Sequence, residues 1–278
     1  MKSSHSVLVV LSGGQDSATC LFWAAKNFQT VHAITFDYGQ RHVRELEAAA
    51  NLAKLAGVAS HEIVQLGPIL KGRSPLTDHS IGLEQYEDFA TMDATIGDRV
   101  ELTFVPMRNA LFLTLAANRA VCLGISDIVT GVCQEDNANY PDCRHSFVVA
   151  QQQAVEQALG LPVGSFFIHT PLMHLTKAES VRFAMSLGCY GELCLSHTAY
   201  DGSYPPVGHD HATILRAHGF EEAGVPDPLL VRAWMEGAIE HLPDTDNYSD
   251  ASTVANVRML VSDTMRRLRT LDNQLTLE

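Results

Sequence analysis

The chain has 278 residues, of which 46% are hydrophobic and 18% are charged. This length and hydrophobic content suit one large globular domain, or one domain with an appendage. The formal net charge of −13 disfavours a nucleic-acid partner, because proteins that grip a duplex or a tRNA body usually present a basic face. We therefore expect a small molecule or a protein as the partner and no nucleic acid.

The cysteines and the apolar segments bear on where the protein works. Six cysteines are scattered along the chain without a CxxC pair, as expected of reduced cytosolic thiols. The N-terminal apolar run at 7–11 is too short for a signal-peptide core or a membrane span, and no later segment is long enough. We predict a cytoplasmic protein with no membrane partner.

Strands and helices are predicted to alternate at short spacing in the first part of the chain. Residues 7–11 form a continuous apolar run that stops at Ser-Gly-Gly, which is typical of a buried parallel strand. The pattern then predicts helix 17–26, strand 31–36, helix 41–56 and strand 62–66. This alternation predicts the α/β class, with a Rossmann-like parallel sheet and right-handed crossovers.

Residues 67–103 interrupt the alternation. They contain several glycines and prolines and little periodicity, so we predict a long irregular insertion that serves as a lid or a binding loop. Regular structure resumes with helix 109–123, strand 127–132, helix 146–159, strand 166–170 and helix 177–187. From 189 to 206 the pattern breaks again.

A final helix is predicted at about 252–271. Its apolar positions step by three or four residues and form one stripe, made of Val254, Val257, Val261, Met265 and Leu268. That stripe must be buried either against the domain or against a partner subunit. We expect a homodimer, for which the stripe offers apolar surface.

The loop after the first strand carries the clearest chemical signal. Its residues are Ser12, Gly13, Gly14, Gln15, Asp16 and Ser17. The glycines permit backbone angles that side chains forbid, so successive N–H groups converge on an anion, and the positive end of the next helix points at the same spot. Asp16 would repel phosphates unless it pairs with Mg²⁺ or a backbone N–H, and we favour Mg²⁺. A glycine-rich turn without a ligand is the alternative.

The spacing of this loop differs from the Walker loop, whose Gly-Lys-Ser/Thr ending is absent. The pattern SGGxDS resembles the PP-loop of the ATP-pyrophosphatases. Those enzymes cleave ATP between the α- and β-phosphates and hold the released pyrophosphate. The resemblance implies the adenine nucleotide alpha hydrolase type of fold, with ATP bound by the loop residues and by Asp37 and Tyr38 beyond the second strand.

Further motifs narrow the resemblance. FDYGQRH follows the second strand at 36–42, VPMRN opens a helix at 105–109, YPDCR stands at 140–144, and TPL at 170–172 leads to Lys177. Together, over about 7–230, they are similar to the 7-cyano-7-deazaguanine synthases, the QueC family. That family converts 7-carboxy-7-deazaguanine to the 7-cyano base with ATP and ammonia. An acyl adenylate gives the amide, and a second adenylation dehydrates the amide to the nitrile.

The resemblance and the side-chain chemistry assign three catalytic residues. Arg108 and Lys177 are suitable cations to offset charge on the phosphates and on the carboxylate, because fixed charges stabilise developing charge in a transition state. Asp16 completes the set as the Mg²⁺ ligand. We expect ATP and Mg²⁺ as the cofactors.

The substrate-binding residues follow from the shape of a guanine-like base. Asp142 can accept hydrogen bonds from N1–H and the amino group, and Arg144 can reach a carbonyl or carboxylate, although the two could also be a plain surface ion pair. Tyr38 or Tyr140 could stack on the base, with core packing as the alternative for Tyr140. The predicted substrate-binding set is Gln40, Asn109, Glu135, Tyr140, Asp142 and Arg144.

The chain departs from the family at 189–220. Family members carry four cysteines there that hold a structural zinc ion. The corresponding positions are Ala199, Val207, Asp210 and Thr213, and since alanine and valine cannot ligate a metal, we expect no zinc. A polar loop without metal is the simpler interpretation. A substitute metal site is the other, made of His197, His209, Asp210 and His211.

The C-terminal tail is the second departure, because the typical member ends soon after the stretch at 224–230. We therefore divide the chain into a PP-loop domain at 1–230 and a helical extension at 231–278, and interpret it as a divergent paralogue. We predict an ATP-dependent C–N ligase that acts on 7-carboxy-7-deazaguanine. The sequence leaves ammonia and a protein amine open as acceptors, and some QueC-like ligases of antiphage systems use the latter. A non-catalytic nucleotide-binding subunit is disfavoured by the intact loop, Arg108 and Lys177.

Overall fold

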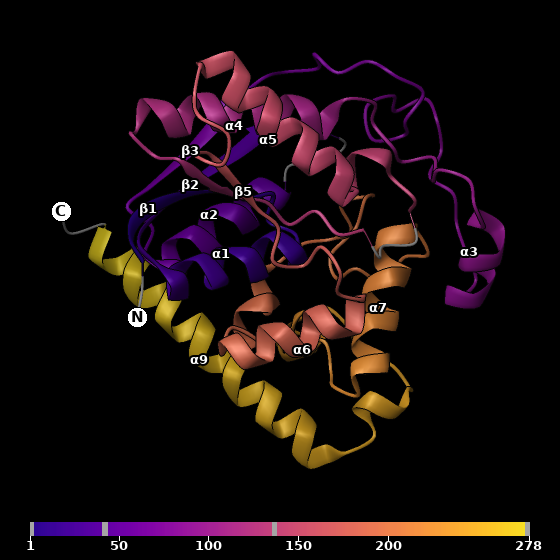
Figure 1. Cartoon of the computed structure of the whole chain (residues 1–278). Helices are drawn as coiled ribbons and strands as arrows, with labels where there is room; N and C mark the ends of the chain where they lie inside the picture. Colours follow the sequence, from indigo (N-terminus) through magenta and orange to yellow (C-terminus); the bar gives the residue numbers. More distant parts are fainter. Residues whose placement is uncertain (1–2, 41–43, 135–137, 276–278) are drawn as a thin grey trace.

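The computed structural model describes residues 3–40, 44–134 and 138–275. Five parallel strands form one sheet in the order β3-β2-β1-β4-β5 (Figure 1). They are β1 (Ser3–Val10), β2 (Phe28–Asp37), β3 (Ser60–Gln65), β4 (Asp127–Val129) and β5 (Phe167–His169). The predicted parallel sheet is confirmed, although β4 and β5 are shorter than the predicted strands.

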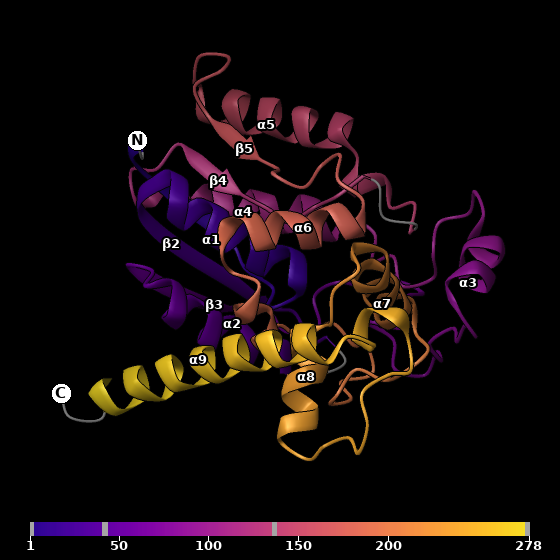
Figure 2. The same ribbon diagram turned by 90° about the horizontal axis from the view of Figure 1, so that it is seen from below.

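Helices cover both faces of the sheet. On one side lie α1 (Gln15–Asn27), α2 (Arg44–Ala56) and α6 (Lys177–Leu187), and on the other lie α4 (Arg108–Cys122) and α5 (His145–Leu159) (Figures 1 and 2). A hydrophobic core lies on each face of the sheet, and strand β1 contributes to both. Val7 and Val9 belong to the core on the α1 side, and Leu8 belongs to the core on the α4 side. Burial of both faces explains why the run at 7–11 is continuously apolar.

Among the described residues, three α-helices lie in segments where the sequence predicted no helix. They are α3 (Phe89–Ile96), α7 (His211–Ala223) and α8 (Pro228–Met235). The prediction of an irregular segment throughout 67–103 is wrong at α3, whose eight residues bury only Met92 and Ile96 and so show too little periodicity to be recognised. This helix packs on α7 through Leu215, and Phe89 stacks on His218 with ring centroids 3.6 Å apart. Part of the insertion is therefore fixed to α7.

The C-terminal helix α9 (Ala251–Leu275) belongs to the main core. Val257, Val261 and Leu268 are at most 7% exposed and share a hydrophobic cluster with β1 and α1. Arg267 of α9 pairs with Glu192 at 2.6 Å, and Lys54 of α2 pairs with Asp272. Three of the five stripe residues are thus buried against their own chain, whereas Val254 and Met265 are partly exposed, and the homodimer stays a prediction.

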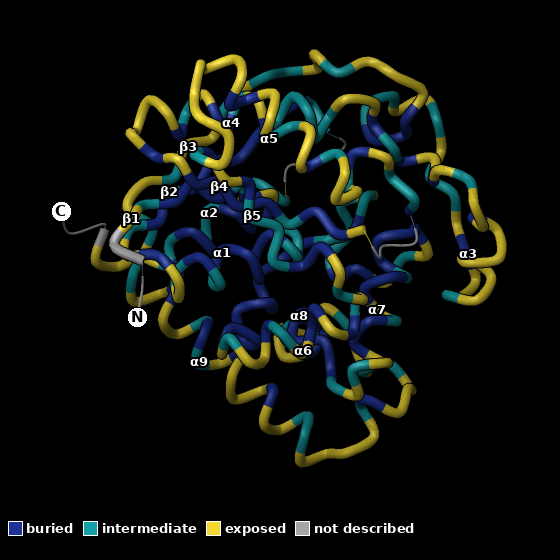
Figure 3. Tube along the Cα trace, in the orientation of Figure 1, coloured by how far each residue is buried: buried dark blue, intermediate teal, exposed yellow. Residues whose placement is uncertain are grey.

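Three short 3-10 helices complete the chain, η1 (Pro141–Cys143), η2 (Gly191–Leu195) and η3 (Asp246–Tyr248). Buried backbone concentrates in the sheet and α1, while α3 and the outer loops are largely exposed (Figure 3). Across the three described stretches, no helix has both the length and the apolar character needed to cross a bilayer.

Candidate active site

A cavity of about 270 Å³ opens at the carboxyl ends of the central strands. Its lining includes Leu11 after β1, Phe36 of β2 and Thr130 after β4. The chain leaves β1 toward β2 on one side of the sheet, whereas β4 is added on the other side. Ligands of open parallel sheets bind at such a reversal of strand order, because the loops diverge there and leave a crevice.

The loop at 12–17 forms one wall of this cavity. The N–H groups of Ser12 and Gly13 donate to Ser17 Oγ at 3.2 Å, and Ser17 Oγ donates to the Gly14 carbonyl at 3.0 Å. Ser17 is buried, and these hydrogen bonds of its hydroxyl stabilise the conformation of the loop. The N-cap residue Gly14 provides no side-chain cap to the first turn of α1. The N–H groups at the start of a helix point toward an anion that binds at its N-terminus.

Two glycines let neighbouring segments approach this loop. Gly13 has φ +92°, and a Cβ there would lie 2.2 Å from the Glu45 carbonyl oxygen in the first turn of α2. A Cβ on Gly131, just beyond β4, would lie 2.9 Å from the Ser17 nitrogen. Larger residues at either position would push α2 or the end of β4 away. The glycines thus bring α2 and β4 to the same cavity as the loop.

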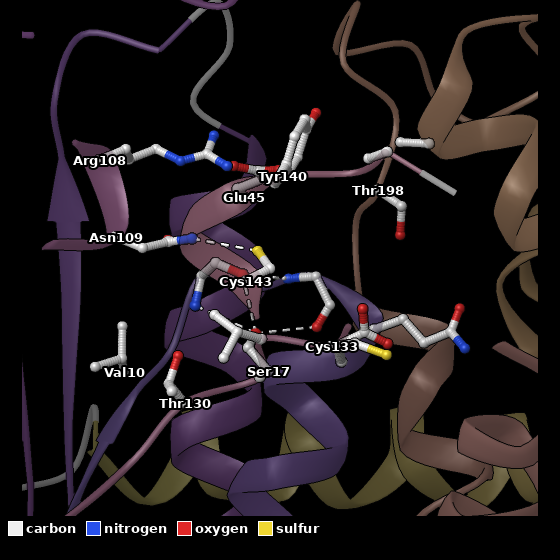
Figure 4. Close-up of a pocket in the computed structure, with 18 of the residues that line it drawn as sticks. Val10, Ser17, Glu45, Arg108, Asn109, Thr130, Cys133, Tyr140, Cys143 and Thr198 are labelled. Atoms are coloured by element: carbon white, nitrogen blue, oxygen red, sulfur yellow. Dashed lines mark hydrogen bonds between the residues drawn. The ribbon is translucent and has the colours of Figure 1, made fainter. Parts of the chain in front are cut away.

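The three predicted catalytic residues meet in this cavity. Lys177 begins α6, and its Nζ lies 2.8 Å from Asp16 Oδ2 in the loop. Arg108 begins α4 and lines the cavity beside Tyr38 and Tyr140 (Figure 4). The first residues of α4 and α6 thus bring two positively charged side chains, Arg108 and Lys177, to the same cavity.

Asp142 lies behind the cavity wall formed by Asn109 and Cys143. Its Oδ2 accepts a hydrogen bond from the Asn109 N–H at 3.2 Å, whereas its buried Oδ1 has no hydrogen-bond partner. Burial raises the pKa of this carboxyl above its usual value. Within the described residues Asp142 makes no ion pair with Arg144, so the surface ion-pair alternative is wrong.

The remaining predicted residues divide between the cavity and its surroundings. Ser12, Gly14, Gln15, Gln40 and Tyr140 line it. Tyr140 is half-buried and its hydroxyl bonds Thr103, so simple core packing does not describe it.

Besides Asp142, three predicted residues of the described chain do not line this cavity, namely Gly13, Asp37 and Arg144. Asp37 lies outside the lining and accepts from the Gly39 N–H, and Gly13 supports the loop from behind. Arg144 lines a neighbouring cavity with His145 and His174. Glu135 lies outside the described residues.

The sequence did not predict that Glu45 and His211 lie in the cavity wall. Glu45 is half-buried, and burial raises its pKa to about 7 although Arg108 opposes the shift. His211 is 4% exposed, both ring nitrogens lack a hydrogen-bond partner, and burial lowers its pKa to about 4. Glu45 could have been found from its place in the first turn after β2, since that turn lies at the same sheet edge as the loop.

Hydrogen bonds engage Asp210 and Thr213, two of the four positions at which the family resemblance places zinc ligands. Asp210 caps α7 by accepting from the Ala212 and Thr213 N–H groups at 3.0 and 3.2 Å, and its Oδ2 accepts from Thr213 Oγ1 at 2.8 Å. His209 Nδ1 meets the Tyr86 carbonyl oxygen at 2.9 Å. In the described part of the chain, no three histidine, cysteine or acidic side chains are grouped to hold a metal ion.

We expect the purified protein to contain no stoichiometric zinc, because Ala199 and Val207 stand at two ligand positions and Asp210 is engaged as a helix cap. Elemental analysis of protein expressed with added zinc checks this. About one zinc ion per chain that survives dialysis against a chelator would contradict it and direct attention to the histidines of this region.

The sequence matches known proteins over most of its length. Residues 6–224 match the family described as queuosine biosynthesis protein QueC. The chain is 51% identical over 227 residues to the 7-cyano-7-deazaguanine synthase of Gloeobacter violaceus, covering 80% of this chain and 94% of that protein. It is 46% identical over 234 residues to the synthase of that name from Laribacter hongkongensis, covering 84% and 97% of the two chains.

Solved structures provide more distant likenesses. One is the NH3-dependent NAD synthetase from Campylobacter jejuni, with a TM-score of 0.38 and 16% identity over 96% of this chain and 88% of that one. Another is the U34-tRNA thiolase NcsA from Methanococcus maripaludis, with a TM-score of 0.38 and 14% identity over 96% and 73%. The family assignment rests on the sequence matches, and the match to the QueC family ends at residue 224, before α8 and α9. The chain is therefore an enzyme that belongs to the QueC family of queuosine biosynthesis proteins.

Proposed function

We propose that this enzyme uses ATP to activate the carboxylate of 7-carboxy-7-deazaguanine and transfers ammonia to the activated carbon. The first products are the amide, AMP and pyrophosphate, and a second adenylation converts the amide to the nitrile. The relatives at 51% and 46% identity are both 7-cyano-7-deazaguanine synthases, which supports this substrate.

The observation that carries the proposal is the phosphate end of the cavity. The uncapped first turn of α1 presents N–H groups, and Lys177 Nζ is fixed 2.8 Å from Asp16 at the same place. Such a turn with an adjacent ammonium suits the pyrophosphate that leaves when AMP is transferred. Asp16 is the loop carboxylate that would hold Mg²⁺, which fits because Mg²⁺ on nucleotides takes one or two carboxylates and completes its shell with phosphates and waters. Bound there, Mg²⁺ would offset the negative charge of the ATP phosphates.

The rest of the cavity suits the nucleoside and the base. Phe36 stacks on Phe112 with ring centroids 4.5 Å apart, and the Tyr38 ring packs at an angle against Phe112. These three rings offer a flat apolar surface to adenine. Arg108 would neutralise the substrate carboxylate. The unpartnered Oδ1 of Asp142 lies just behind the lining residues Asn109 and Cys143, and it would accept from the N1–H and amino group of the deazaguanine, since a buried acceptor without a partner is costly until a donor arrives.

Mass spectrometry of the products tests this function. With ATP, 7-carboxy-7-deazaguanine and ammonium, we expect one AMP and one pyrophosphate for each amide and a second pair for each nitrile. Release of ADP and phosphate would contradict the proposal. A parallel reaction without ammonium but with candidate acceptor proteins distinguishes the remaining alternative, because a deazaguanine adduct on a protein amine would replace ammonia as the acceptor.

A further inference from the structure

Two carboxylates line the cavity among the described residues, Asp16 and Glu45. Asp16 is held by the Lys177 ammonium at 2.8 Å, at the phosphate end. Glu45 stands on the first turn of α2, which the close approach of Gly13 fixes against the loop. Glu45 is therefore the carboxylate of this cavity that is not committed to a cation of the phosphate site.

The described groups that face Glu45 from neighbouring elements are Arg108 at the start of α4 and Tyr38 beyond β2. Arg108 also bonds the Tyr38 side chain and faces Tyr140, and the two side chains Arg108 and Glu45 lie close together with Tyr140 in the upper part of Figure 4. Arg108 is the residue that would bind the substrate carboxylate. Glu45 therefore stands where the carboxyl carbon of the substrate would react.

We propose that Glu45 is the base that removes protons from the nitrogen during amide and nitrile formation. This inference rests on the proposed function. The loop at 12–17 and Lys177 serve the cleavage of ATP. Glu45 would serve the later attack of ammonia, because that half-reaction needs a base and the cleavage of ATP does not.

Proton balance shows where a base is needed. In the first half-reaction the substrate carboxylate attacks the α-phosphorus and pyrophosphate leaves, so no proton is released. In the second, the ammonia nitrogen attacks the acyl carbon and the bond to AMP breaks, with the electron pair leaving on AMP. The nitrogen then carries three hydrogens and a positive charge, and it gives one proton to the carboxylate of Glu45. In the nitrile half, the amide oxygen is adenylated and leaves with AMP, while the nitrogen loses both remaining protons.

Three other titratable groups of the cavity wall, His211, Tyr38 and Tyr140, are poorly suited to this step. Burial lowers the pKa of His211 to about 4, so its imidazole binds protons too weakly. Burial raises the pKa of Tyr38 and Tyr140, which therefore keep their protons. A base works best when its pKa lies near the working pH, and the pKa of Glu45 is about 7, so it can accept a proton at neutral pH and release it after each turnover.

The conservative variant Glu45→Gln separates the two half-reactions. Amide formation should fall by about 100-fold or more, the range expected for loss of a general base. The acid-dependent exchange of radiolabelled pyrophosphate into ATP should stay within a few-fold of wild type, because that half-reaction releases no proton. Glu47→Gln changes an exposed glutamate in the same turn and should leave both reactions unaltered.

Hydroxylamine supplies a rescue experiment. It is largely unprotonated at neutral pH, and its attached proton is acidic enough after attack to pass to water. The Glu45→Gln variant should therefore form the hydroxamate at a rate close to that of wild type, while its reaction with ammonium stays slow.

Three results would overturn the inference. One is a Glu45→Gln variant that makes amide at the wild-type rate. Another is equal loss of pyrophosphate exchange and amide formation, which would make Glu45 a binding or structural residue. The third is the absence of rescue by hydroxylamine. A wild-type enzyme without acid-dependent exchange would instead contradict the proposed function itself, so the two failures are distinguishable.

Discussion

Replacement of Lys177 by methionine is expected to lower the acid-dependent release of pyrophosphate by about 100- to 1000-fold, the usual effect of removing one preorganised donor from a site of developing charge. Methionine keeps the length of the side chain and removes its charge. The ammonium lies 2.8 Å from Asp16 beside the uncapped turn of α1, where charge accumulates as the α–β phosphate bond breaks. Quantifying AMP by chromatography at saturating substrates measures the change.

The matched control is Lys54→Met. Lys54 forms an ion pair with Asp272 between α2 and α9, far from the cavity lining, and exposed pairs contribute little to stability. This variant should keep wild-type activity. If Lys177→Met retained more than a tenth of the wild-type rate, the phosphates would have to be held by the loop without Lys177.

The second large effect is expected from Asp142→Asn. Binding of 7-carboxy-7-deazaguanine should weaken by about 100-fold or more, because the swap turns an acceptor into a donor that faces the donors of the base. The side chain keeps its shape, so the swap is expected to leave the fold intact. Calorimetric titration with each ligand separately measures the effect.

ATP affinity provides the internal control in this experiment. It should be unchanged in Asp142→Asn, since Asp142 contacts Asn109 and not the loop at 12–17. Wild-type affinity of the variant for the deazaguanine acid would show that Asp142 only positions Asn109. The base pocket would then have to be sought near Gln40 and Asn109.

The features that the sequence predicted correctly depend on contiguous residues. The strand, the Ser-Gly-Gly turn and the helix that follows stand side by side at 7–27, so their relation is visible without the fold. The alternation of strands and helices that predicts a parallel sheet is also local, because it depends only on the spacing of hydrophobic residues along the chain. Helices α3 and α8 have eight residues each, which is too short for a reliable periodic signal.

The residues that escaped prediction reach the site through contacts distant in sequence. Glu45 enters the cavity because Gly13 lets α2 touch the loop, a contact between segments more than thirty residues apart. His211 faces the cavity from a helix whose start is set by the Asp210 cap. Neither contact leaves a local pattern. The buried Oδ1 of Asp142 was likewise invisible, because an unpartnered atom is defined only by the packing around it.

The position of α9 has a consequence for biosynthesis. Val257, Val261 and Leu268 complete the same cluster that contains β1 and α1, which are translated more than 200 residues earlier. Until the residues up to Leu268 have been translated, the surfaces of α2 and η2 that α9 covers remain open to water. Exposed apolar surface on a nascent chain attracts chaperones and other nascent chains. This cluster thus closes only after α9 has been translated, so the time needed to translate the chain from α1 to α9 governs how long that surface stays exposed.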